Sequence, residues 1–167
     1  MPRCGRSLSV LLLALLGGCG IHYGFSKGAF PSNIKTMAVL PFDNSTSSPD
    51  VQRELYDAMR GELQKRLGVR DAPESRADAV VSGKITGYDA DVPVSFSSNP
   101  NQSVSARRKL QLTVSVQIID QKTGKPLWES SSLSASGEYA ERAESDGRKL
   151  AIQRLVDQIV EGAQSQW

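Results

Sequence analysis

The chain has 167 residues, with 20 Lys and Arg against 18 Asp and Glu, which gives a formal net charge of +2. This near-neutral balance argues against nucleic-acid binding, which requires a basic surface. Aromatic residues make up 6% of the chain, too few for a platform that stacks bases or sugars. The length suits a single domain with a sizeable core.

The first nineteen residues have the pattern of an export signal. Two arginines give a positive start, residues 8–16 form an apolar run, and Gly17 and Gly18 precede Cys19. The run is too short to span a bilayer, which takes about 20 apolar residues. An ordinary signal peptide cleaved near Gly18 fits these residues. The leucine three positions before the cysteine and the paired glycines resemble a bacterial lipobox, which implies acylation of Cys19.

We therefore expect residues 1–18 to be removed, residues 19–33 to form a lipidated tether, and residues 34–167 to form one domain. Several acyl chains on Cys19 would anchor the protein stably. Gly20 stands where, by resemblance to bacterial lipoproteins, an aspartate would signal retention in the inner membrane. The resemblance thus implies the outer membrane, facing the periplasm. The other cysteine lies in the removed segment, so the mature chain is expected to hold without a disulfide.

The first half of the domain contains two expected strands and a helix. Residues 36–42 form an apolar run with a β-branched centre, which predicts a strand. Ser48 as N-cap, Pro49 at the first helical position and apolar residues at three- and four-residue spacing predict an amphipathic helix that ends at Gly68. Weak alternation over residues 79–88 predicts the second strand.

The second half begins with a polar segment, residues 89–105, which predicts an exposed loop too long to be an idle hairpin connection. Strict alternation over residues 109–118 predicts a strand with one buried, apolar face and one solvent-exposed, polar face. A turn at residues 120–125 leads to a returning strand over residues 126–139. Apolar residues at helical spacing over residues 150–163 predict a second amphipathic helix.

The order strand, helix, strand, strand, strand, helix predicts an α+β fold. It is a two-layer sandwich, in which a four-stranded mixed sheet carries two amphipathic helices on one face. The crossover helix predicts that the first two strands are parallel, and the connections after it predict an antiparallel meander.

Catalytic and metal-binding patterns are absent from the sequence. His22 is the single histidine and lies three residues from Cys19 in the expected tether. General acid–base catalysis needs a second positioned group, and a metal needs several ligands. No G-x-S-x-G motif and no glycine-rich phosphate loop is present. We therefore expect no enzymatic activity, no cofactor and no metal site.

The densest basic cluster of the expected domain is Arg-Arg-Lys at residues 107–109, at the end of the long loop. It fits either a solvated strand end or an anion site, because guanidinium groups bind phosphate bidentately. Arg142 and the pair at 148–149 add charge before the last helix. Acidic neighbours at 141, 144 and 146 make a solvated helix start the default interpretation of these charges.

Four passages together resemble the LptE family, the lipopolysaccharide-assembly lipoproteins of the outer membrane. CGIHY at 19–23 is similar to the mature start of that family, and TMAVLPFDNST at 36–46 to its first strand and turn. ADAVVSGKI at 77–85 resembles the strand after its first helix. VQIID, TG and LWE within 116–129 resemble its last hairpin.

This resemblance implies a non-enzymatic lipoprotein that binds inside the lumen of LptD, a large outer-membrane β-barrel, helps the barrel to assemble and assists lipopolysaccharide insertion into the outer leaflet. Lipopolysaccharide contacts in the family involve basic side chains near the loop between the second and third strands and before the last helix. Arg107, Arg108 and Arg142 occupy comparable regions and are the candidate lipopolysaccharide-binding residues.

An alternative resemblance rests on VLPFDN at 39–44. It is similar to the first strand of periplasmic domains like the TolB amino-terminal domain, the curli secretion lipoprotein and lipoprotein activators of cell-wall synthases. It implies a secretion-pore subunit or an enzyme activator. A pore needs extra segments that insert in the membrane, and the polar residues 89–105 are poor candidates. His22 after Cys-Gly-Ile favours LptE.

Overall fold

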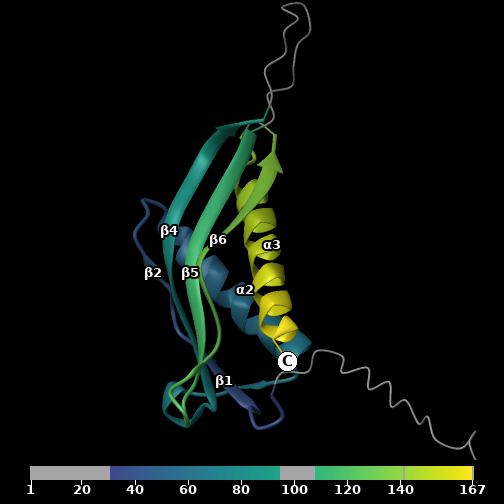
Figure 1. The fold of residues 1–167 in the computed structure, drawn as a ribbon. Coiled ribbons are helices and arrows are strands. Elements are labelled where there is room, and N and C mark those ends of the chain that lie inside the picture. The colour runs from purple at the N-terminus through teal and green to yellow at the C-terminus, as the bar shows by residue number, and fades with distance from the viewer. Residues whose placement is uncertain (1–30, 95–107, 141, 167) are drawn as a thin grey trace, which may run out of the picture.

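Three long strands form the body of the sheet in the computed structural model, which describes residues 31–94, 108–140 and 142–166. Two helices lie together on one side of this sheet (Figure 1). The elements in chain order are β1 (Thr36–Val39), β2 (Asp43–Asn44), α2 (Pro49–Leu67), β3 (Arg70–Asp71), the 3-10 turn η2 (Glu74–Arg76), β4 (Ala79–Pro93), β5 (Arg108–Asp120), β6 (Pro126–Tyr139) and α3 (Glu144–Ser165).

The sheet is mixed and has six strands in the order β3-β1-β4-β5-β6, with β2 pairing β4 beside β1. β1 pairs in parallel with β3 and β4, whereas β4, β5 and β6 form an antiparallel meander. The α+β class, the mixed sheet and the two helices are therefore as predicted, but the predicted count of four strands is wrong. The two additional strands, β2 and β3, have two residues each, too short to produce a periodic pattern in the sequence.

The strand predicted over residues 36–42 is interrupted at Pro41. Val39 is paired with Val81, and pairing to β4 resumes only at Asp43 and Asn44. Proline has no N–H to donate to a ladder, which explains the break. Phe42 turns into the core, where it is fully buried. Its ring lies over Gly83, and a Cβ at Gly83 would come within 2.5 Å of the Phe42 Cε1.

Both helices are amphipathic and bury one stripe, as their residue spacing predicts. α2 has Pro49 at its start, and Gly68 ends it with φ at 69°, a left-handed conformation that glycine adopts without strain. Ser48 occupies the N-cap position but donates and accepts no side-chain capping hydrogen bond. α3 begins at Glu144, earlier than the apolar pattern indicates, because its first turn is polar. The buried residues of the two helices are Val51, Leu55, Met59, Leu63, Gly147, Ala151, Ile152, Leu155, Val156, Ile159, Val160 and Ala163.

β4 continues through Pro93, so the first residues of the segment predicted as a loop belong to the sheet. Two register shifts interrupt its pairing with β5, between Ile85 and Gly87 and between Asp89 and Val92. Such bulges break the period-two pattern of a strand, which hides it from a sequence reading. The remainder of the predicted loop, residues 95–105, lies outside the described residues.

The core lies between the sheet and the two helices. It combines the helical stripes with the alternate residues of β5, from Leu110 to Ile118. α3 approaches β6 closely at two glycines. A Cβ at Gly162 would meet the ring of Trp128 at 2.6 Å, and one at Gly147 would meet Tyr139 at 2.5 Å. These glycines therefore serve close packing, a role their positions near the helix ends did not reveal.

Candidate functional site

The face of the sheet that the helices leave uncovered carries polar side chains. Along β5 the residues that alternate with the buried ones are Gln111, Thr113, Ser115 and Gln117, and all four are exposed or half-buried. Because successive side chains of a strand point to opposite faces, this row lies on the side opposite the core. We name this surface the open face, defined by the outward residues of β4, β5 and β6.

Side chains on the open face bond to one another across strands. Gln117 donates its Nε2 to the Ser82 hydroxyl oxygen at 3.1 Å. The Thr113 and Ser134 hydroxyls share a hydrogen bond of 2.8 Å. A shallow hollow of about 810 Å³ lies over the part of this face nearer the turn between β5 and β6. It is lined by Asp43, Ser82, Gly83, Lys84, Ser115, Val116, Gln117, Glu129, Ser130 and Ser131. The hollow thus offers hydroxyl and amide groups together with three charged side chains, those of Asp43, Lys84 and Glu129.

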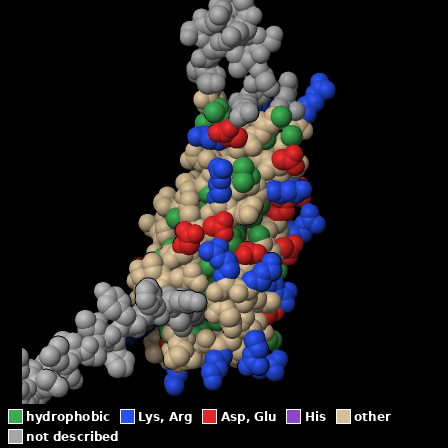
Figure 2. Space-filling model, turned by 90° about the vertical axis from the view of Figure 1, so that its right-hand side faces the viewer, with side chains coloured by type: hydrophobic (Ala, Val, Ile, Leu, Met, Phe, Trp, Pro, Cys, Tyr) green, Lys and Arg blue, Asp and Glu red, His purple; other side chains and the backbone are tan. Residues whose placement is uncertain are grey.

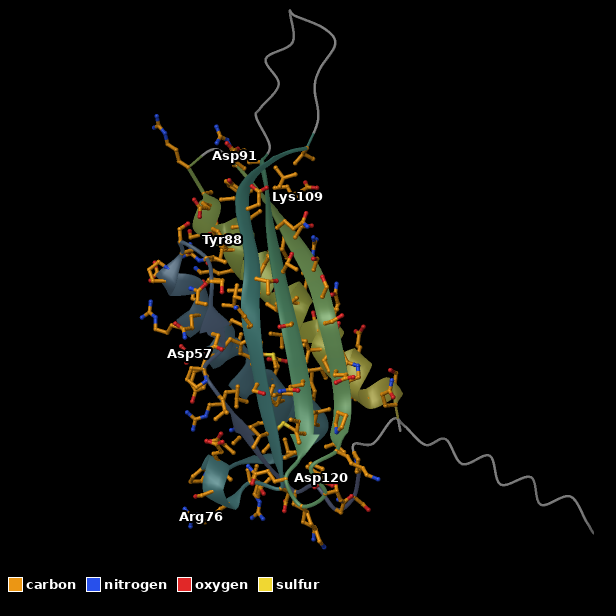
Figure 3. The ribbon with its side chains drawn as sticks, turned by 60° about the vertical axis from the view of Figure 1, so that its left-hand side comes forward. Asp57, Arg76, Tyr88, Asp91, Lys109 and Asp120 are labelled. Atoms are coloured by element: carbon orange, nitrogen blue, oxygen red, sulfur yellow. The ribbon has the colours of Figure 1, made fainter. Side chains whose placement is uncertain are left out.

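Arg108, a predicted site residue, lies at the end of the sheet where β5 begins. Its guanidinium donates to the Asp91 carboxylate at 2.9 Å, and its side chain is 43% exposed. Asp91 is labelled at this end in Figure 3, next to Lys109. In the neighbouring strand the Tyr139 hydroxyl donates to the Ala90 carbonyl, and burial raises the pKa of Tyr139. Arg108 therefore combines a neighbouring counter-ion with an accessible guanidinium.

Arg142, the second predicted site residue within the described part, lies in the turn between β6 and α3. Its side chain is exposed, and its φ of 68° is a left-handed conformation that non-glycine residues rarely adopt. Tyr139, at the end of β6, is the register partner of Arg108. Since Arg142 follows Tyr139 by three residues, the structure brings the two arginines to the same end of the molecule.

Arg148, by contrast, is not available to an external anion. Its guanidinium makes two hydrogen bonds of 3.0 Å to the two carboxylate oxygens of Glu54, which joins α3 to α2. It also donates to the Tyr88 hydroxyl at 3.4 Å. The Arg148 side chain is only 14% exposed, and the Glu54 hydrogen bonds raise its pKa further above the usual arginine range. The contribution to an anion site that the sequence suggested for Arg148 is therefore wrong.

The described part of the chain contains neither a cluster of metal ligands nor a helix that could span a membrane. Within residues 31–94, 108–140 and 142–166, no three His, Cys, Asp or Glu side chains are grouped so that they would hold a metal ion. In the same ranges no helix combines the length and the apolar character that crossing a bilayer requires.

The family follows from a match to residues 34–161, which extends from the residue pair before β1 into the last turns of α3. The matched family is LptE, described as lipopolysaccharide-assembly. The chain belongs to the LptE family. No curated protein matches it. Because the match spans the sheet and both helices, it includes the open face and the end of the sheet that carries Arg108.

Solved structures share the fold of this LptE domain at low identity. The PelC dodecamer from Paraburkholderia phytofirmans is 18% identical, with 81% of this chain and 93% of that chain covered and a TM-score of 0.55. Protein CT253 from Chlamydia trachomatis is 14% identical, with 79% and 96% covered and a TM-score of 0.56. XCC0632 from Xanthomonas campestris is 7% identical, with 80% and 86% covered and a TM-score of 0.54. These identities show a common fold alone.

Two of the site residues predicted for this LptE-family chain, Cys19 and Arg107, lie outside the described residues. The open face was missed as a site, although alternation along β5 predicted a wet face. What the alternation did not reveal is that β4 and β6 continue the same polar character on both sides of it.

Proposed function

We propose that this LptE-family protein is a non-enzymatic outer-membrane lipoprotein, acylated at Cys19, that binds inside the lumen of an LptD-like β-barrel. There it assists assembly of the barrel and insertion of lipopolysaccharide into the outer leaflet. The observation that carries this proposal is the family match over residues 34–161.

The chemistry of the open face supports contact with a barrel interior. Large outer-membrane barrels have polar, wet interiors, and interfaces of polar groups hold bridging water without becoming weak. The row Gln111, Thr113, Ser115 and Gln117, with Ser82 and Ser134 on the flanking strands, supplies such groups. The apolar residues of the same strands face the helices, so docking through this face leaves the core undisturbed.

We further propose that Arg107, Arg108 and Arg142 contact lipopolysaccharide. Arg108 and Arg142 lie at one end of the sheet, and the Arg108 side chain is accessible while Asp91 pairs with part of its guanidinium. Lipopolysaccharide carries phosphate groups, which guanidinium groups bind through paired hydrogen bonds. Arg107 directly precedes Arg108 in the sequence.

Affinity purification from detergent-solubilised outer membrane tests the barrel proposal. The tagged chain is expected to recover a large β-barrel. The variant Gln111→Arg/Gln117→Arg introduces two charges on exposed positions of the open face and is expected to lower that recovery at least about ten-fold, since unpaired buried charge at an interface costs several kcal/mol. The matched variant Gln64→Arg/Gln153→Arg places the same charges on exposed helix positions and should retain the barrel.

The outcomes of this purification separate the two classes of function. A homo-oligomeric ring or a cell-wall synthase, recovered without a large barrel, would overturn the LptD proposal in favour of the secretion or activator class. Equal loss of the barrel with both double variants would keep the partner but contradict the claim that the open face contributes more to the interface than the helices do.

A binding titration with purified lipopolysaccharide tests the arginines. Arg107→Ala, Arg108→Ala and Arg142→Ala together are expected to weaken binding and to reduce its dependence on salt, because each removes a phosphate partner. The control is Arg53→Ala, at a side chain that is 74% exposed on α2. Unchanged affinity and unchanged salt dependence in the triple variant would remove these residues from the site.

A further inference from the structure

The end of the sheet opposite Arg108 carries a group of cations that the proposed function does not use. At this end the start of β1, β3, η2 and the β5–β6 turn come together. The Arg70 amide donates to the Lys35 carbonyl at 2.9 Å, and the Gln121 side chain donates to the Glu74 carbonyl at 2.9 Å. We name this surface the basic end and define it by Lys35, Arg70, Arg76, Lys122 and Lys125.

Lysine and arginine side chains gather at this lower end of the molecule in Figure 2. Figure 3 places Arg76 there, near Asp120 and at the far end of the sheet from Asp91. All five cations of the basic end are exposed, and none forms an ion pair with a residue in the described ranges. Their charges therefore face solvent, and among them Lys35 lies close enough to an acid, Asp78, to lower the pKa of that acid through its charge.

The acids near the basic end are mostly engaged elsewhere. Asp71 pairs with Arg60 of α2. Asp78 accepts hydrogen bonds from two backbone amides and a hydroxyl at the start of β1. Asp120 is 6% exposed and accepts the amides of the turn that follows it. Glu74 remains exposed. With Asp71 balanced by Arg60, the five cations stand against three acids, Asp78, Asp120 and Glu74, so the described part of this end has a net excess of two positive charges.

We infer that the basic end rests on a membrane surface and contacts the phosphate groups of anionic lipid headgroups. The orientation rests on the proposed acylation of Cys19. The described chain begins at this end, where the Pro31 carbonyl accepts a hydrogen bond from the Ile34 amide just before β1. Residues 19–30 are twelve residues, which reach at most about 40 Å when extended. An acyl anchor at Cys19 therefore holds the basic end within reach of the bilayer.

The contact is electrostatic and superficial. Among the described residues the one large hydrophobic side chain that is exposed is Val94, at the other end of the sheet, so this end presents no apolar wedge for insertion. One acyl-bearing residue and a polybasic surface act together as two membrane signals. Each lysine or arginine near an anionic surface strengthens binding roughly five-fold, and the attraction decays within about 10 Å at 0.1 M salt.

Vesicle co-sedimentation tests the inference with the full mature chain carrying Cys19→Ala, which has no acyl chain. We expect binding to vesicles that contain phosphatidylglycerol and none to vesicles of phosphatidylcholine alone, with loss of binding between about 0.05 M and about 0.5 M NaCl. Lys122→Gln/Lys125→Gln is expected to weaken binding roughly twenty-fold. Arg53→Gln/Lys149→Gln removes the same charge from the helices and should change it less than about two-fold.

Three results would overturn the inference: no binding to the anionic vesicles at low salt, equal binding to both kinds of vesicle, or equal losses in the two double variants. The last result would assign the attraction to overall charge. Purification of the acylated chain with a large barrel is independent of all three, so a failure of the basic end leaves the proposed function intact. Conversely, binding by the basic end without a recovered barrel would sustain only the membrane contact.

Discussion

The helix-covered face of β5 is a continuous row of buried aliphatic side chains, whereas the open face of the same strand is a row of glutamine, threonine and serine. The covered face is closely packed, with glycines of α3 fitted against the rings of β6. The open face holds hydroxyl and amide groups that already bond to one another at 2.8 to 3.1 Å. Along β5, therefore, the buried residues that stabilise the fold alternate with outward residues that are available to contact a partner.

Adjacent substitutions on β5 sharpen this comparison most strongly. Leu112 is fully buried, so Leu112→Ala is expected to lower the free energy of unfolding by about 2–5 kcal/mol through lost burial and a residual cavity. Gln111→Ala, one residue away on the open face, should change it by no more than about 0.5 kcal/mol. Urea unfolding of both variants measures the two values. Similar losses would show that the open face also carries the stability of the fold.

The Arg148–Glu54 pair is a largely buried ion pair between the two helices of the covered side. Arg148→Met leaves a Glu54 carboxylate that is 27% exposed without its two hydrogen bonds, and we expect a loss of about 1–3 kcal/mol. In a double-mutant cycle with Glu54→Gln, the two effects should be clearly less than additive. Additive effects would mean that the pair contributes nothing as a pair. Arg53→Met, at a 74% exposed side chain, is the control.

Gly162→Ala probes the contact between α3 and β6. The new methyl meets Trp128 at 2.6 Å, which costs about 1–3 kcal/mol, while alanine improves helix propensity by up to about 1 kcal/mol. A net loss of about 1–2 kcal/mol is expected in thermal or urea unfolding. With Trp128→Leu in the background the same substitution should become neutral or stabilising. A loss that persists there would contradict the packing explanation.

Asp78 gives the smallest and most specific effect. Backbone and side-chain hydrogen bonds from Lys35 and Thr36 lower its pKa below the usual 3.8. A carboxyl group whose pKa is lower in the folded state stabilises the fold above about pH 4 and loses that contribution as the pH falls through the lowered pKa. The stability difference between the unchanged chain and Asp78→Asn should therefore shrink toward acid. A difference independent of pH would exclude this linkage.

The sequence predicted those elements whose residue pattern runs without interruption from one end of the element to the other. Alternation from Lys109 to Ile118 located β5 almost to its ends, and the proline and glycine signals marked both ends of α2. The covered face, the parallel first pair and the meander followed from these patterns. The predicted number of strands was wrong, and residues 89–93 at the end of β4 were predicted as loop. Two-residue strands have no period, and bulges interrupt one.

The surface contacts of the fold were harder to predict than its elements because they depend on residues distant in the chain. Arg148 and Glu54 are separated by 94 residues, and nothing local marks either as the partner of the other. The basic end collects its cations from four segments, each carrying only one or two of them. The structure brings Arg108 and Arg142 to one end because β6 returns antiparallel to β5 and Arg142 follows the last residue of β6 by three positions.

Site-specific photocrosslinking in intact cells tests the central proposal most directly. A photoreactive residue at Gln117 or Ser115 on the open face is compared with one at the exposed Gln64 on α2. The proposal predicts that the open-face positions crosslink to a large outer-membrane β-barrel and that Gln64 does not. Crosslinks between two copies of this chain from the open face, or barrel crosslinks from Gln64 alone, would contradict it.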